Sequence, residues 1–511
     1  ILRAKAIAFE NAAGRDREVL DELGNTVLYG HPDAQAILTK IQVENDRLLI
    51  LRNTVEGERP AGFVSYREIG NEDLFGVLKD MELANLVRGK SSREILLITG
   101  IYAREDGTGD SGVIRDAPQQ LLVEVLAKEL EKNYSFALFV AERGTATKEV
   151  VYVLERQGFI RPHMADENDK RTIYMVDMHE PLMFLHNLDT TIKEPFASNP
   201  AVLDAVEKNH KKLQIAMTKL YPGNLVLSLS SGIMYHRLVD RITALNDVPR
   251  EPLVPRRLGK NMCVPFGKIL RGKVVPNTVT KTLHTDKVYE PDLNSFTIEP
   301  FPYYSPLKSQ IETIKSFDRP VILVDDLVHT ANRLQVLVPQ LREDGIPIKK
   351  VVVGVLSGYG RDLMQCLKVP VESIYSMPNL RQWFVESTLY PFIGGDTVRR
   401  EEMKVAGLQP SINMILPYAT PRLSGCSREA LVEFSACCIE NSRDLFQVLE
   451  AEYRKMYAKN LTLSRLSEAV ILPLCPDKGS CMEYDENLAA SVYLENDLET
   501  LWRMKEFLIK G

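Results

Sequence analysis

The sequence predicts an α/β protein with several domains, and three observations support this fold class. The chain has 511 residues, which is enough for two to four domains that each bury a core. Short apolar strands alternate with amphipathic helices over roughly the first 410 residues. The last hundred residues instead carry helical spacing. We therefore expect two consecutive α/β domains, at 1–184 and 190–410, and a helical C-terminal region at 411–511.

Composition and charge limit the classes of function. Hydrophobic residues make up 45% of the chain and charged residues 26%, the balance of an ordinary globular protein. A net charge of −6 favours neither nucleic acid nor an anionic membrane as a partner. No signal peptide is evident, and the seven cysteines show no metal-ligand spacing. We expect a cytoplasmic protein that binds a small molecule. Because the chain begins with Ile1, preceding domains of a longer protein stay open, as does a homo-oligomer.

The first region, residues 1–184, reads as an alternation of strands and helices. Expected strands are 46–53, 62–69, 93–106, 136–142 and 171–178, and expected helices are 116–133 and 147–160. The helix end "LERQGF" (154–159) and the long central strand before a helix N-terminus are similar to the GNAT superfamily of acetyltransferases. In that family the helix N-terminus holds the pyrophosphate of acetyl-CoA on free backbone N–H groups.

The residues at that helix start depart from the family pattern. Asp116 and Pro118 stand where the family has glycines, so one brings like charge to a phosphate and the other removes a donor. The stretch "EDGTGDSG" (105–112) supplies glycines but also three acids. Leu154 takes the place of the family's frequent tyrosine acid, and Tyr152 lies two residues earlier. The resemblance implies either an acyl-CoA-dependent N-acetyltransferase or a degenerate domain of the same fold.

The second region contains strand–turn–helix units. A helix over 201–220 precedes the apolar strand 225–230, and the strand "VILV" (321–324) runs directly into Asp325 and Asp326. A polar turn, a helix and the apolar strand 349–358 follow. Successive β–α–β units imply a parallel sheet, whose ligands bind beyond the carboxyl ends of the strands. Since two adjacent carboxylates repel, they predict a cationic or polyhydroxylated ligand at this strand end.

The stretch "VILVDDLVHTANR" (321–333) resembles the signature of the type I phosphoribosyltransferases. That signature has four apolar residues, two acids and a Thr-Gly-Gly-Thr-like turn. The resemblance implies that Asp325 and Asp326 hydrogen-bond the ribose hydroxyls of phosphoribosyl pyrophosphate (PRPP), directly or with Mg²⁺ nearby. It also implies that Thr330 and the backbone N–H groups of Ala331, Asn332 and Arg333 hold the 5′-phosphate.

The same resemblance assigns further site residues. Ser230, Ser231 and Gly232 fall where the family grips pyrophosphate, a position that suits exposed N–H groups before a helix. Lys281, a candidate catalytic residue with the two aspartates, and His284 lie in the segment 271–289, where the family has a mobile hood. Trp383 or Phe384 would stack the base, and packing under the sheet is the alternative for both.

The turn has lost both family glycines, so binding and catalysis are separate expectations. Asn332 tolerates a left-handed conformation, whereas Ala331 adds a Cβ close to the expected phosphate. The leading hypothesis is a phosphoribosyltransferase that uses PRPP and Mg²⁺ with an unidentified acceptor in nucleotide metabolism. The alternatives are a non-catalytic sensor of PRPP or a nucleotide, a scaffold, and an acetyltransferase in which the second domain is accessory. In the C-terminal region, Ser427 suits the N-cap of a long amphipathic helix over 428–457.

Overall fold

The computed structural model describes most of the chain, which folds as two compact units that interleave along the sequence. The described residues are 7–54, 57–91, 94–104, 116–142, 147–162, 171–255, 257–302, 304–400, 407–478 and 484–510. The first unit comprises the residues up to Met183 together with Pro222–His236 and Tyr375–Gln382. The second comprises Phe184–Tyr221, Arg237–Ile374 and the residues from Trp383 onward. Among the described residues, no helix combines the length and apolar character needed to cross a bilayer.

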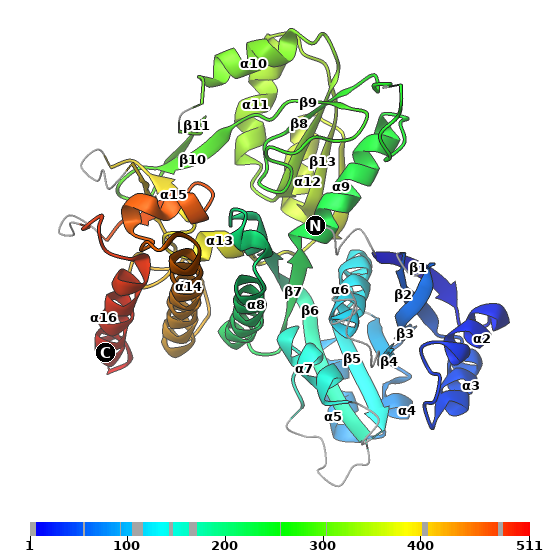
Figure 1. Ribbon diagram of the computed structural model, residues 1–511. Helices are drawn as coiled ribbons and strands as arrows, with labels where there is room; N and C mark the ends of the chain where they lie inside the picture. Colours follow the sequence, from blue (N-terminus) through cyan, green and yellow to red (C-terminus); the bar gives the residue numbers. More distant parts are fainter. Residues whose placement is uncertain are drawn as a thin grey trace. The chain divides into compact units, whose positions relative to one another are not determined.

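A mixed sheet of eight strands organises the first unit (Figure 1). The strand order is β1-β2-β3-β4-β5-β6-β15, and β7 also pairs with β6. The strands are β1 Ile7–Ala13, β2 Arg47–Asn53, β3 Arg59–Ile69, β4 Ile95–Ala103, β5 Phe136–Glu142, β6 Arg171–His186, β7 Asn224–Ser230 and β15 Gln382–Val385. From β1 to β6, neighbours run antiparallel except for the parallel pair β4 and β5. That pairing joins Leu96–Ile98 to Ala137–Phe139, and both strands continue past it.

The helices of this unit include the two expected at 116–133 and 147–160, together with others that were not predicted from the sequence. They are α2 Arg17–Asn25, α3 Ala34–Glu44, α4 Leu74–Leu78, α5 Met81–Lys90, α6 Ala117–Glu129 with the 3₁₀ turn η1 Leu130–Lys132, and α7 Lys148–Arg156. Gly158 follows α7 with φ +91°, and a Cβ there would lie 2.1 Å from the carbonyl oxygen of Asn224. Only glycine fits this position. The expected strand 171–178 extends to His186, because Leu182, Met183 and Phe184 continue its buried run.

The second unit contains the predicted parallel sheet, which consists of five strands in the order β14-β13-β12-β8-β9. These are β8 Met262–Pro265, β9 Val279–Thr280, β12 Val321–Val328, β13 Ile348–Ser357 and β14 Val371–Met377. The pairs β8–β9, β8–β12 and β12–β13 are parallel. The associated helices are α10 Leu307–Lys315, α11 Asn332–Glu343, α12 Gly358–Cys366 and the part of α9 Ser231–Leu245 from Arg237 onward. Buried side chains of β8, β12 and β13 form one apolar core with α10 and α11.

A second five-stranded sheet includes short strands from the C-terminal region, which the sequence predicted to be helical and which also contains long helices. Its order is β11-β10-β16-β17-β18, formed by β10 Thr285–Tyr289, β11 Phe296–Pro300, β16 Asp396–Val398, β17 Gln409–Ile412 and β18 Leu474–Pro476. Strands of three or four residues are too short to show an alternating pattern. The predicted domain boundaries at 184, 190 and 410 stay predictions, since the two compact units interleave.

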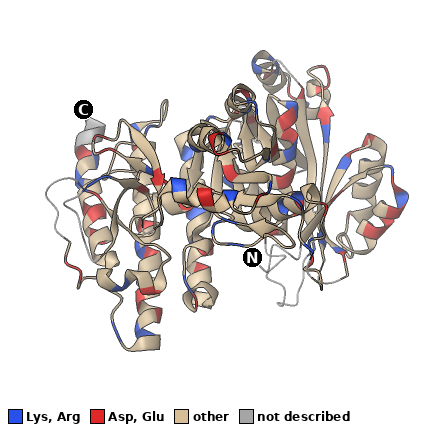
Figure 2. Cartoon of the chain, turned by 90° about the horizontal axis from the view of Figure 1, so that it is seen from above, with Lys and Arg blue, Asp and Glu red and all other residues tan. Residues whose placement is uncertain are grey.

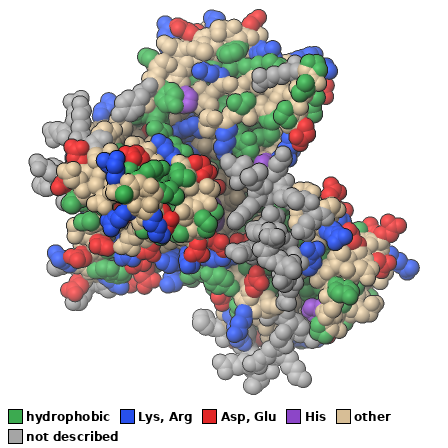
Figure 3. All heavy atoms as spheres, in the orientation of Figure 1, with side chains coloured by type: hydrophobic (Ala, Val, Ile, Leu, Met, Phe, Trp, Pro, Cys, Tyr) green, Lys and Arg blue, Asp and Glu red, His purple; other side chains and the backbone are tan. Residues whose placement is uncertain are grey.

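Three long helices of the second unit lie side by side, α8 Pro200–Leu220, α14 Arg428–Tyr457 and α16 Ala490–Lys510 (Figure 1). Shorter elements complete the unit: α13 Glu386–Leu389, α15 Leu466–Ala469, and the 3₁₀ turns η2 Leu188–Thr190, η3 Phe196–Ser198 and η4 Leu463–Arg465. As predicted, the Ser427 side chain caps α14 by accepting the N–H of Ala430. Acidic and basic side chains are interspersed along the elements (Figure 2) and mixed with hydrophobic ones on the face shown in Figure 3.

Candidate functional site

The two aspartates lie inside β12, at a point where one neighbouring strand has ended and the other continues. Pairing with β8 ends at Val324 opposite Pro265, whereas pairing with β13 reaches Val328 opposite Leu356. The sequence predicted that the strand would end at Val324, which is correct only on the β8 side. Asp325 and Asp326 therefore face the loop that follows β8. This geometry places both carboxylates at a carboxyl end of the parallel sheet.

Asp326 holds that loop through two backbone hydrogen bonds. Its Oδ2 accepts the N–H of Lys268 at 2.7 Å, and its Oδ1 accepts the N–H of Ile269 at 3.0 Å. The loop passes so close that a Cβ on Gly267 would lie 2.5 Å from an Asp326 oxygen and 2.8 Å from an Asp325 oxygen. This loop was not among the sites predicted from the sequence, although "PFGK" (265–268) places a glycine and a lysine directly after an apolar strand, which is a usable signal.

Asp325 is in a different environment from its neighbour. It is only 8% exposed, its Oδ1 accepts the N–H of Asp326 at 2.9 Å, and the Arg333 guanidinium is 3.7 Å away. Burial raises the pKa of Asp325 to about 7, since the positive charge of Arg333 offsets only part of the desolvation. The Asp325 carboxyl group is therefore more easily protonated than an ordinary aspartate.

Basic side chains gather around the same loop. Burial lowers the pKa of Lys268, and the positive charges of Arg271 and Arg333 lower it further. Burial likewise lowers the pKa of Arg271, followed by the charge of Arg333. Asp286 and Asp396 counteract part of this effect at Lys268, so the group contains both signs. Three cations and two carboxylates of β12 are therefore close enough to perturb one another.

Arg271 is incompletely bonded within the part of the chain that the structure describes. Its Nε and Nη2 are buried and have no hydrogen-bond partner there, and its guanidinium carbon lies 5.2 Å from the centre of the Phe301 ring. A buried guanidinium normally has hydrogen-bond acceptors around it, because leaving its N–H groups unpaired costs free energy. The arrangement would be completed by an anion that accepts hydrogen bonds from Arg271.

Lys281 and His284, both predicted from the sequence, belong to this neighbourhood. Burial lowers the pKa of His284, and the charges of Arg271 and Lys281 lower it further. The His284 ring stacks on Tyr304 with centroids 3.7 Å apart. The backbone N–H of Lys281 donates to Cys263 of β8 at 3.0 Å. The segment expected as a mobile hood is thus hydrogen-bonded to the sheet at this point.

The predicted phosphate loop, Thr330 to Arg333, leads into α11. Ala331 adopts the left-handed conformation, with φ 49° and ψ 22°, and Asn332 begins the helix. The left-handed position is therefore Ala331 and not the more tolerant Asn332. The Asn332 side-chain amide donates to the Thr330 hydroxyl at 2.8 Å. Arg333 turns back toward β8 and donates from Nη1 to the carbonyl of Phe266 at 3.4 Å.

The remaining predicted residues differ in their surroundings. Trp383 is partly exposed and lies 5.0 Å from the His329 ring, whereas Phe384 is buried against Phe434, 5.6 Å between centroids. Trp383 is therefore the better placed of the two to contact a ligand. Ser230 ends β7 and Ser231 begins α9 with no turn between them, and both belong, with Gly232, to the first compact unit. Their predicted contact with pyrophosphate stays a prediction.

In the first unit, the predicted acetyl-CoA loop is only partly described. Residues 105–112 lie outside the described residues. Asp116 is the N-cap residue of α6 without a side-chain capping bond, and Pro118 lies in the first turn. Leu154 is fully buried, whereas Tyr152 is 42% exposed. The start of α6 thus contains Asp116 and Pro118, the two residues that depart from the expected pyrophosphate-binding pattern.

Comparisons with known proteins bear on about a third of the chain. No protein-family model and no curated protein matches the sequence of this chain. Solved structures that it resembles include a GNAT-family acetyltransferase from Bacillus cereus (13% identity, 34% of this chain, 96% of that chain, TM-score 0.20). Another is a Drosophila melanogaster polyamine N-acetyltransferase (8% identity, 34% of this chain, 99% of that chain, TM-score 0.24). A third is the catalytic domain of Tetrahymena GCN5 histone acetyltransferase in complex with coenzyme A (10% identity, 34% of this chain, 92% of that chain, TM-score 0.23). A likeness at this level identifies neither an activity nor a ligand.

The acid pair does not form a ready site for a resident Mg²⁺. Both oxygens of Asp326 already accept backbone N–H groups, and Asp325 Oδ1 accepts another. Mg²⁺ prefers an octahedral set of hard oxygen ligands, and it is repelled by nearby cations such as Arg333. The residues present fit a ligand that combines hydroxyl groups with phosphate better than they fit a bare divalent ion.

Proposed function

We propose that the second unit binds a phosphorylated ribose, either PRPP or a nucleotide, at the carboxyl ends of β8 and β12. The observation that carries this proposal is the incompletely bonded, buried guanidinium of Arg271 beside Lys268 and Arg333. A phosphate group offers the acceptors that Nε and Nη2 of Arg271 lack among the described residues. Asp325 would accept hydrogen bonds from ribose hydroxyls, as the resemblance to type I phosphoribosyltransferases implies.

In the transferase form of this proposal, a nitrogen nucleophile bonds to C1 of the ribose while the bond from C1 to pyrophosphate breaks. Pyrophosphate then leaves with its electron pair, and Lys268, Arg271 and Lys281 would stabilise its charge. Any Mg²⁺ would enter bound to the pyrophosphate of the ligand. In the sensor form, the same residues bind PRPP and release it unchanged. The altered loop with Ala331 is compatible with both forms.

Arg271→Met tests the proposal, since it keeps the length of the side chain and removes its charge. Hydrogen bonds to charged groups are worth about 1.5–3 kcal/mol, so PRPP affinity should fall roughly 10- to 100-fold. Isothermal calorimetry with PRPP, in the presence of Mg²⁺, measures this. The melting temperature should stay unchanged or rise, because a poorly paired buried cation has been removed.

Arg503→Met is the matched control, because its side chain is 79% exposed on α16 and makes only a surface pair with Glu499. This variant should bind PRPP like the parent protein. If the parent shows no PRPP binding, or if Arg271→Met binds equally well, the proposed site is wrong. A panel of bases, amines and nicotinate-like acids then separates the two forms, because only a transferase releases pyrophosphate.

A second candidate function, acyl transfer from a coenzyme A thioester, belongs to the first unit. Its support is the short pairing of β4 with β5, which ends at Ile98 and Phe139 although both strands continue. Strands that stop pairing expose backbone N–H and C=O groups to a ligand. Asp116 and Pro118 at the start of α6 count against tight binding of a pyrophosphate there.

A further inference from the structure

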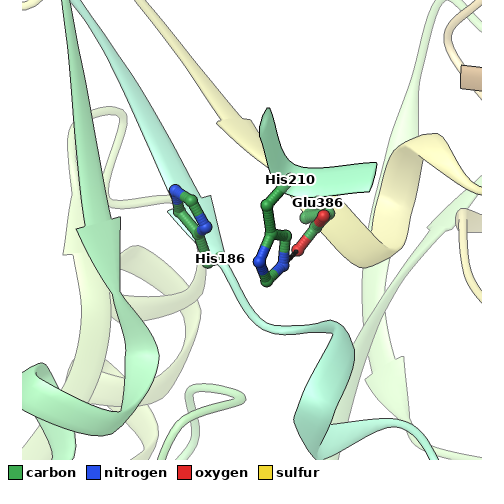
Figure 4. Close-up of side chains that lie close together, drawn as sticks. All are labelled: His186, His210 and Glu386. Atoms are coloured by element: carbon green, nitrogen blue, oxygen red, sulfur yellow. Dashed lines mark hydrogen bonds and ion pairs between the residues drawn. The ribbon is translucent and has the colours of Figure 1, made fainter. Parts of the chain in front are cut away.

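Two histidines and a glutamate converge in the second unit, away from Asp325 and its loop in the sequence. His186 is the last residue of β6, His210 lies in α8, and Glu386 is the first residue of α13. One ligand atom from each lies within 4.8 Å of the other two (Figure 4). Because 176 residues separate His210 from Glu386, a local sequence motif cannot predict this group.

Each member of the group is held in place by its surroundings. His210 Nε2 lies 2.6 Å from Glu386 Oε2, and the rings of His186 and His210 meet edge to face at 4.4 Å. The N–H of Asn187 donates to Glu386 Oε2 at 3.4 Å. The side-chain amide of Gln214, one helical turn after His210, lies 3.1 Å from His186 Nε2. Partners of this kind fix the ring planes of ligand histidines in metal sites.

The set is chemically suited to one class of ion. We propose that His186, His210 and Glu386 bind a divalent transition-metal ion, with Zn²⁺ as the best fit. Two imidazoles and one carboxylate, with a further position left to water or another ligand, form a common zinc site, whereas Mg²⁺ and Ca²⁺ prefer oxygen ligands alone.

The geometry needs only small changes to accept the ion. Bonds of about 2.0–2.1 Å in a tetrahedral site place ligand atoms about 3.3 Å apart. The His210–Glu386 distance of 2.6 Å must therefore open slightly, and separations of up to 4.8 Å must close. The first change is about 0.7 Å and the second is at most about 1.5 Å. The His210 side chain is 19% exposed and Glu386 is fully buried, so an ion reaching the imidazole would find the carboxylate behind it.

The ion would join three segments that are distant in the sequence. It would link the end of β6 to α8 and to α13, and Glu386 is three residues after Trp383. Binding to the folded protein alone stabilises it by mass action, so Zn²⁺ should raise the melting temperature as well as bind. This second readout does not depend on any catalytic activity.

The test is titration of the tag-free, chelator-treated full chain with Zn²⁺ by calorimetry and with Co²⁺ by visible absorption. We expect one ion per chain with a Kd of about 10 μM or tighter, and the intense absorption of a four-coordinate Co²⁺ site. His210→Ala should weaken binding by more than the roughly 10- to 100-fold that follows loss of an orienting partner. Glu386→Gln and His186→Gln should weaken it too, which covers the case in which His210→Ala fails to fold.

His179→Ala is the matched control. His179 forms a similar pair with Asp177, 2.8 Å apart, but it is not one of the three converging residues. This variant should bind Zn²⁺ like the parent. The proposal is overturned if the parent binds no Zn²⁺ in this range, or if the three site variants bind and are stabilised as the parent is. In either case the group is a buried hydrogen-bonded pair of His210 and Glu386 without a metal function.

Discussion

At the scale of single residues, Asp325 and Asp326 are adjacent in the sequence but differ in their bonding. Asp326 accepts two N–H groups from the loop after β8, whereas Asp325 is buried and forms an ion pair with Arg333 at 3.7 Å. The resemblance assigned both to ribose hydroxyls. We expect Asp326 to hold the loop and Asp325 to contact the ligand. A sequence motif identifies the pair, but only the packing around each carboxylate distinguishes them.

The raised pKa of Asp325 predicts a pH-dependent stability. Burial raises this pKa to about 7 from an ordinary value of 3.8, so the folded chain keeps a proton that the unfolded chain has lost. Stability should therefore fall as pH rises from about 4 to about 7. Asp325→Asn removes this effect, and thermal unfolding should show a higher melting temperature at about pH 8 and little change at about pH 4.

Asp444→Asn is the control, because the pKa of Asp444 is shifted in the opposite direction from that of Asp325. Burial raises the pKa of Asp444, but the hydrogen bonds and charges of Arg443 and Lys212 outweigh it and lower this pKa overall. The ionised form of Asp444 stabilises the fold, so its removal should lower the melting temperature at about pH 8. A lower melting temperature for Asp325→Asn at that pH would show that the Asp325 carboxylate is instead a stabilising partner.

At the scale of elements, the start of α11 combines a required backbone shape with an unfavourable residue. Ala331 is left-handed, a conformation that costs an L-residue about 1–2 kcal/mol. Ala331 is only 7% exposed and packs in the apolar core of the second unit. The type I phosphoribosyltransferase turn has glycine in this part of the loop. The stretch that resembles this signature therefore has alanine, and not glycine, at its left-handed position.

Ala331→Gly should leave the stability of the second unit nearly unchanged. The relieved strain of about 1–2 kcal/mol is offset by the extra backbone entropy of glycine, about 0.5–1 kcal/mol, and by the lost burial of the methyl group, about 0.8 kcal/mol. Denaturant unfolding measures it. Ala430→Gly, within the first turn of α14, should instead lose about 1 kcal/mol. If both variants lose stability equally, the left-handed conformation of Ala331 is not strained.

The elements also show what sequence patterns can predict. Long periodic segments were located well: α8 and α14 begin within a residue of their expected starts, and Ser427 caps α14 as expected. Burial on both faces explains why β12 and β13 were recognised as apolar runs. The short strands β17 and β18 carry no such signal, because three or four residues cannot establish a period.

At the scale of the whole molecule, each compact unit contains its own candidate site. The first has the start of α6 beside the parallel pair of β4 and β5, and the second has the carboxyl ends of β8 and β12. Local motifs in the sequence predicted both candidate sites. The sequence did not reveal the loop 266–271 or the group of His186, His210 and Glu386. Those depend on contacts between segments far apart in the chain, which local periodicity does not encode.

The two sites predict different ligand preferences for the full chain. Asp116 brings like charge to the α6 N-terminus and Pro118 lacks a donor, so acetyl-CoA should bind with a Kd weaker than about 10 μM. Calorimetry with acetyl-CoA measures this, and a PRPP titration of the same sample reports on the other unit. Tight acetyl-CoA binding would contradict the expectation and favour acyl transfer as the function of the first unit.

The interleaving of the two units has a consequence for the order in which the chain matures on the ribosome. The first unit includes Tyr375–Gln382, where Tyr375 donates from its hydroxyl to Glu124 at 3.0 Å and the N–H of Arg381 donates to the carbonyl of Pro181 at 3.0 Å. These contacts cannot form until residue 382 of 511 has been synthesised. The first unit therefore lacks these contacts during the time in which most of the second unit is translated.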